Sequence, residues 1–84
     1  MSDKIFLAEM SQGQTGKVVE IQGGLGMMSK MDSLGIRQGK EITKVNDQWM
    51  RGPVLIRQGN TQVAVGYGMA QRVLVEVSDN GGKV

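Results

Sequence analysis

Glycine divides this chain into short segments, and that limits the folds it can form. Thirteen of the 84 residues are glycine, and the stretches between them are rich in Val and Ile. Short β-branched runs bounded by glycine are typical of strands joined by tight turns. A chain of this length forms one domain with a small core. The pattern therefore predicts a mainly β domain.

Five segments are predicted to be strands: residues 16–22, 40–45, 54–57, 62–65 and 72–77. In the first, Val18, Val19 and Ile21 do not alternate, which indicates a bulge or strong curvature. The last alternates well, with its valines on one face. Gly59-Asn60 between two such runs is typical of a hairpin.

Residues 27–34 are the helix candidate, because Met27, Met31 and Leu34 form one apolar stripe at helical spacing. Gly35 and Ile36 then predict a Schellman ending, with Ile36 packing back on Met31. Residues 66–70 read as a tight turn with a single turn of 3-10 helix.

Together these elements predict a small SH3-like five-stranded barrel with one inserted helix and a short 3-10 turn before the last strand. An OB-like barrel is the structural alternative, although its strands are usually longer. We assign residues 1–77 to the barrel and residues 78–84 to a flexible C-terminal tail.

The composition points away from catalysis. The chain has no His and no Cys, and its eight acidic residues are isolated in sequence. No acid–base pair, activated nucleophile, metal site or cofactor site can be named, so we expect a binding protein and not an enzyme. The absence of Cys, and an N-terminal apolar run too short to be a signal peptide or a membrane span, predict a cytoplasmic protein.

Several sequence features allow a structural and a functional interpretation. The glycines at 23, 24 and 26 favour a steric turn over an anion cradle. The methionines at 27, 28 and 31 favour core filling over thioether coordination. Trp49-Met50-Arg51 lies in a polar loop, where the Trp either caps the barrel or anchors a partner. Four basic residues favour a solvated face over a contact with an acidic partner: Lys40, Lys44, Arg51 and Arg57.

An ordered set of motifs resembles the FeoA family over about residues 5–77. The set includes Gly16-Lys17-Val18, Leu34-Gly35-Ile36 with Gly39, Gly52-Pro53-Val54, and Val63-Ala64-Val65-Gly66 followed by Gly68-Met69-Ala70. The resemblance implies an SH3-like barrel and an accessory role in bacterial ferrous iron transport. The family is often described as binding transition-metal ions. This sequence departs from the family pattern with Lys30 in place of Arg, Met28 and Met31 in place of Leu, and Gln38 in place of Pro.

The partner implied by the resemblance is the cytosolic G-domain of a FeoB-type membrane transporter. We expect the contact surface to be the helix and the neighbouring loops: Leu25, Met27, Lys30, Trp49, Met50 and Arg51. The alternative is a nucleic-acid-binding small β-barrel, but sparse aromatic residues and dispersed charges disfavour it, and we expect no nucleic acid and no membrane insertion. The oligomeric state is left open.

Overall fold

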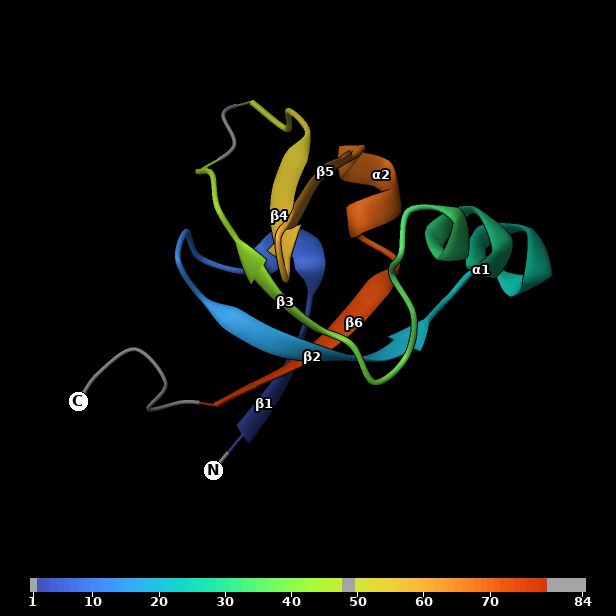
Figure 1. Ribbon diagram of the computed structural model, residues 1–84, viewed down its shortest axis with the longest axis horizontal. Helices are drawn as coiled ribbons and strands as arrows, with labels where there is room; N and C mark the ends of the chain where they lie inside the picture. The colour runs from blue at the N-terminus through green and yellow to red at the C-terminus, as the bar shows by residue number, and fades with distance from the viewer. Residues whose placement is uncertain (1, 48–49, 79–84) are drawn as a thin grey trace.

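The structure is a computed structural model that describes residues 2–47 and 50–78. Figure 1 shows the arrangement of its elements. Their order is β1 (Ser2–Phe6), the 3-10 helix η1 (Leu7–Glu9), β2 (Thr15–Ile21), α1 (Gly24–Ser33), β3 (Glu41–Lys44), β4 (Val54–Gln58), β5 (Thr61–Val65), α2 (Tyr67–Ala70) and β6 (Val73–Ser78).

All six strands form one antiparallel sheet in the order β1-β6-β2-β3-β4-β5. The mainly β, SH3-like fold with one inserted helix is confirmed. Two details of the prediction are wrong for the part of the chain that the structure describes: it forms six strands instead of five, and their pairing does not close into a barrel. The additional strand is β1, which forms because β6 offers a free edge: Val75 faces Ile5 on one side and Val18 on the other.

The predicted bulge in β2 is confirmed. The register of β2 against β6 shifts between Val18 and Glu20, so Val19 is the additional residue. A bulge of this kind bends the strand and strengthens its twist. β2 therefore pairs with β6 along its length while its first residues, from Thr15 to Lys17, also pair with β3.

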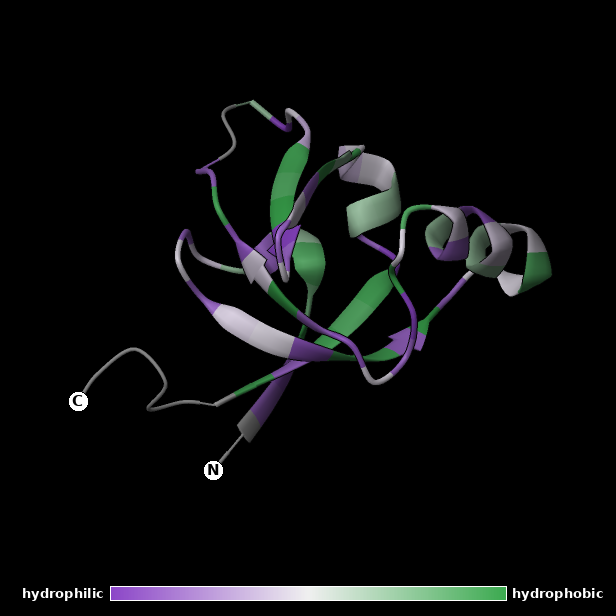
Figure 2. Ribbon diagram, viewed as in Figure 1, coloured by the Kyte–Doolittle hydropathy of each residue, from purple (hydrophilic) through white to green (hydrophobic). Residues whose placement is uncertain are grey.

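The core lies on the concave face of the sheet. The predicted alternation of β6 is confirmed, because Val73, Val75 and Val77 are all buried. Figure 2 shows green, hydrophobic stretches along β4 and β6. The other buried apolar side chains are Leu7, Met10, Val18, Ile21, Met31, Ile36, Ile42, Val54, Ile56, Val65 and Ala70.

α1 begins earlier than the predicted residue 27. The chain enters it through Gly23 and Gly24, whose φ angles of 114° and 79° are accessible to glycine at little cost. The Schellman ending is confirmed: the Ile36 amide donates to Met31 O at 2.9 Å and the Gly35 amide donates to Asp32 O at 2.9 Å. α1 therefore ends with Ile36 returning to the core beside Met31.

The short helical turns differ in type from the prediction. The segment before β6, Tyr67–Ala70, is one turn of α-helix instead of 3-10 helix. The amide of Ala70 reaches back four residues to Gly66 O at 2.9 Å, which is the α-helical spacing. The 3-10 helix lies at Leu7–Glu9, after β1. β6 continues through Ser78, and the rest of the expected tail lies outside the described residues.

Candidate protein-interaction surface

α1 turns part of its apolar stripe toward solvent. Met31 is fully buried and Met27 packs partly against the core, in agreement with core filling. Leu25 and Met28 are not covered in the same way, because their exposed fractions are 83% and 42%. Because Leu25 and Met28 are three residues apart on the helix, they lie side by side and form one small exposed apolar area. We call these two residues, Leu25 and Met28, the α1 surface.

A groove runs beside this helix, between α1, the end of β2 and the segment that follows the helix. Its volume is about 550 Å³. Its apolar walls come from Ile21, Leu25, Met28 and Ile36, and its polar rim comes from Ser29, Asp32, Arg37 and Gln38. The Gln38 side chain donates to Val19 O at 3.0 Å, which ties the segment after α1 to the bulge of β2. The groove therefore has a fixed wall opposite the helix.

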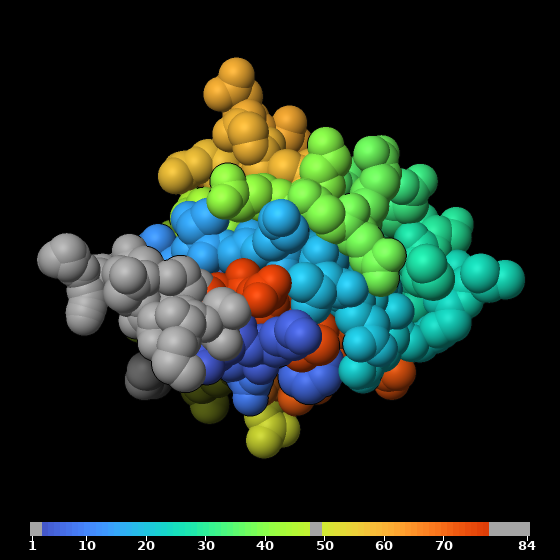
Figure 3. All heavy atoms as spheres, turned by 90° about the horizontal axis from the view of Figure 1, so that it is seen from below, coloured from blue at the N-terminus to red at the C-terminus, as the bar shows by residue number. Residues whose placement is uncertain are grey.

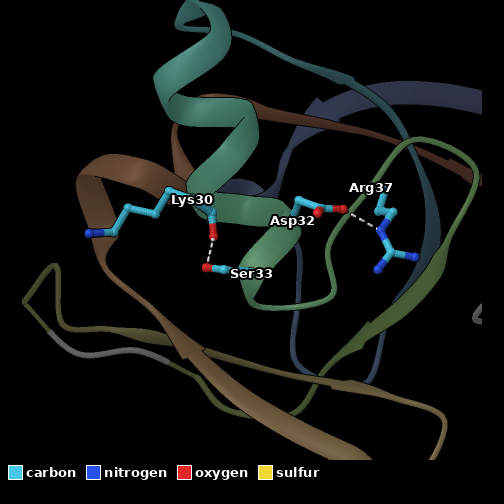
Figure 4. A network of polar contacts seen from close by, with 4 residues as sticks. All are labelled: Lys30, Asp32, Ser33 and Arg37. Carbon is cyan, nitrogen blue, oxygen red and sulfur yellow. Dashed lines mark hydrogen bonds and ion pairs between the residues drawn. The ribbon is translucent and has the colours of Figure 1, made fainter.

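The rim of the groove carries charge. Arg37 Nε and Asp32 Oδ1 form an ion pair, and the two side chains are 55% and 61% exposed. Figure 4 shows this pair together with Ser33, whose hydroxyl donates to Lys30 O at 2.7 Å. In the same view the Lys30 side chain extends away from the Asp32–Arg37 pair. An exposed ion pair contributes little to stability, so its members are available to a partner.

The structure separates the predicted contact residues into two groups. Leu25, Met27 and Lys30 are all on α1, but Leu25 and Met27 are two residues apart and point to different sides of that helix. Met50 and Arg51 lie in the connection between β3 and β4, at the opposite end of the molecule in Figure 1. Both have left-handed φ angles, 54° and 61°, and Met50 is 83% exposed. Trp49 lies outside the described residues.

The base of the β3–β4 connection is held by Asn46. Its side-chain amide donates to Pro53 O at 3.1 Å, and its carbonyl oxygen accepts from the Leu55 amide at 2.9 Å. The Val45 amide donates to Leu55 O at 2.9 Å. These three bonds fix the two ends of the connection to each other, so Met50 and Arg51 project from a defined base.

Lys44 does not belong to a solvated basic face. Its side chain is only 3% exposed, and its Nζ donates to Met10 O at 2.6 Å. Burial lowers the pKa of Lys44, and the nearby charge of Asp47 partly opposes that effect. The prediction for Lys44 was wrong, whereas Lys40, Arg51 and Arg57 are exposed as expected. The sequence did hold a clue, because Lys44 follows Ile42 at strand spacing and Ile42 points into the core.

Residues 2–47 and 50–78 contain neither a cluster of three metal-ligating side chains nor a helix that could span a membrane. Within those ranges, no three His, Cys, Asp or Glu side chains come close enough together to hold a metal ion. Within the same ranges, the helices are too short or too polar to cross a membrane.

Comparison with known proteins shows to which family this chain belongs. The FeoA domain model matches residues 5–77. The chain belongs to the FeoA family. The resemblance seen in the sequence is thereby confirmed, and it covers nearly all of β1 to β6.

Two FeoA relatives support the assignment. A protein of Methanocaldococcus jannaschii named "Putative Fe(2+) transport protein A" is 32% identical over 77 residues, which is 92% of each chain. The crystal structure of an "Iron Uptake Regulatory Protein (FeoA)" is 36% identical with a TM-score of 0.79, and the match covers 87% of this chain and 95% of that one.

The FeoA fold also occurs as part of larger proteins. A manganese-dependent transcriptional repressor superposes with a TM-score of 0.81 at 20% identity. The match covers 93% of this chain but 44% of the repressor. At that identity the similarity concerns the fold alone.

Proposed function

We propose that this protein is a cytoplasmic accessory protein of ferrous iron transport that binds the cytosolic G-domain of a FeoB-type transporter. It acts through binding and not as an enzyme. The names of its FeoA relatives support the transport role. The observation that carries the binding role is the exposed apolar end of α1, where Leu25 stands 83% exposed next to a groove with apolar walls.

The α1 surface has the composition of a protein contact. Leu25 and Met28 offer apolar area whose burial contributes about 25 cal/mol per Å². The groove beside them offers a receiving site for one apolar side chain of the partner. The Asp32–Arg37 pair borders this area with charge, which orients a partner more than it strengthens the complex.

Regulation of a transporter requires that the accessory protein distinguish two of its states. A binder with equal affinity for both nucleotide states would shift neither population. The α1 surface therefore acts by preferring one conformation of the G-domain. A tenfold preference corresponds to about 1.4 kcal/mol, which the gain or loss of one apolar contact supplies.

The test is calorimetric titration of the G-domain in its nucleotide-free, GDP-bound and GTP-analogue-bound states. We expect binding in at least one state and a clear difference in affinity between states. Leu25→Gln should weaken binding about tenfold or more, as truncation of a central apolar anchor does. Met50→Gln is the matched control, because Met50 is equally exposed but lies at the opposite end of the molecule.

Two results would contradict the proposal in different ways. No binding in any nucleotide state would remove the proposed function. Binding that is weakened by Met50→Gln and unaffected by Leu25→Gln would keep the function but move the contact from the α1 surface to the β3–β4 connection.

A further inference from the structure

β5 is an outer strand without the usual protection of a sheet edge. In the part of the chain that the structure describes, it pairs with β4 alone. Its sequence, Thr-Gln-Val-Ala-Val, contains no charged residue and no proline. Natural edge strands normally carry a lysine, a proline or a bulge that prevents pairing with another chain. β5 has none of these, and its pairing with β4 is regular over all five residues.

The edge is also accessible. Thr61, Gln62 and Ala64 are exposed and Val63 is half-buried, whereas Val65 is buried. Figure 3 shows the β4–β5 hairpin, in yellow-orange, projecting beyond the body of the molecule. A strand that pairs with β5 would cover the part of Val63 that now faces solvent.

We propose that β5 pairs with β5 of a second copy of this chain, antiparallel, around a two-fold axis at Val63. A two-fold axis between antiparallel strands must be perpendicular to the sheet, so both copies keep their core faces on the same side. Centring it on Val63 pairs all five residues: Val63 with itself, Thr61 with Val65, and Gln62 with Ala64.

The charges around β5 favour a second copy over a charged segment of another protein. Across β4 and β5, Arg57 stands opposite Gln62 and Leu55 stands opposite Ala64. In the paired sheet, a line of neighbouring residues across four strands therefore runs from Arg57 and Gln62 of one copy to Ala64 and Leu55 of the second copy. Arg57 is the single charged residue in each such line, so the pairing brings no two like charges together. An acidic or basic segment would find no opposite charge within β5.

The pairing leaves the α1 surface free, because α1 follows β2 and shares no sheet edge with β5. The inference is thus independent of the transporter partner. Since one short strand pair is a small interface, the association should be weak, in the range of high micromolar to millimolar dissociation constants.

The experiment is sedimentation equilibrium of the whole chain from micromolar to millimolar concentration. Wild-type protein should pass from monomer to dimer over this range. Gln62→Glu with Ala64→Glu places like charges opposite each other twice and should weaken dimerisation about tenfold or more. Gln62→Glu with Ala64→Lys places opposite charges there and should restore the dimer, more strongly at low salt.

Both variants keep the monomer intact, because residues 62 and 64 are exposed and a glutamate at 62 faces Arg57 within the same chain. Equal melting temperatures at micromolar concentration check this. Three results would overturn the inference: a wild-type protein that stays monomeric at millimolar concentration, equal dimerisation of the two variants, or assembly beyond a dimer that neither variant alters.

Discussion

Gly16 sits where three strands meet, and an added methyl group there should be costly. It pairs with Ile42 of β3 on one side and with Val77 of β6 on the other. A β-carbon built at Gly16 would lie 2.3 Å from Val75 Cγ1, 2.7 Å from Val77 Cγ1 and 2.9 Å from Glu76 O. The closest of these contacts is about 1 Å shorter than van der Waals contact allows.

The surroundings of Gly16 have little freedom to relax. Val75 and Val77 are 0% and 3% exposed, so rotating them pushes into a packed core. The Glu76 carbonyl belongs to the backbone of β6, which also holds β1. Overpacking of this kind costs about 1–3 kcal/mol, and with two side chains and a backbone atom displaced we expect about 2–3 kcal/mol for Gly16→Ala.

Thermal and urea unfolding followed by circular dichroism measures this cost. A loss of about 2–3 kcal/mol lowers the melting temperature of a domain of this size by roughly 8–24 °C. Gly26→Ala is the matched control, because that glycine lies in α1 with no atom within 4 Å of an added β-carbon. It should raise stability by about 0.5–1 kcal/mol. If Gly16→Ala melts within a degree or two of wild type, the close approach of β2 and β6 is wrong.

Three further predictions use the same unfolding assays. Met31→Ala removes a fully buried side chain and should cost about 2–5 kcal/mol, and a cost below 1 kcal/mol would argue against a core position. Gly35→Ala should cost about 1–2 kcal/mol because its φ of 85° disfavours a β-carbon, and Gly35→Asn should cost less because Asn tolerates that region better. For Lys44, burial lowers the pKa in the folded protein, so the unfolded chain retains the proton to higher pH. Stability relative to Lys44→Met should therefore rise as the pH passes from the lowered pKa to the ordinary value of 10.5, and a flat difference would show that Lys44 is solvated.

Features set by neighbouring residues could be predicted from the sequence. The helix ending at Gly35 and Ile36 depends on one left-handed residue followed by one apolar residue, and the structure has both hydrogen bonds. The bulge at Val19 follows from a break in alternation within one strand. Features set by distant residues could not be predicted in this way. β1 has a polar start, and it is a strand because β6 lies beside it.

The candidate surface was predictable in part. Leu25, Met27 and Lys30 lie on one helix, but helical spacing brings together only Met27 and Lys30, and it places Leu25 beside Met28 instead. Whether that helix lies near the β3–β4 connection depends on the path of the whole sheet, which places Met50 and Arg51 at the other end. The exposure of Met28 was also unexpected, because an apolar stripe shows which residues share a face but not how deeply the face is covered.

Asn46 has a consequence for how this fold tolerates change. Its side chain bonds both Pro53 and Leu55, so the two ends of the β3–β4 connection are joined through one residue. The alignment of β3 and β4 therefore depends on these Asn46 hydrogen bonds and not on the residues between the two strands. Evolution or a protein engineer can lengthen, shorten or replace residues 47–52 without shifting the strands on either side, and the connection is a natural position for grafting a foreign peptide.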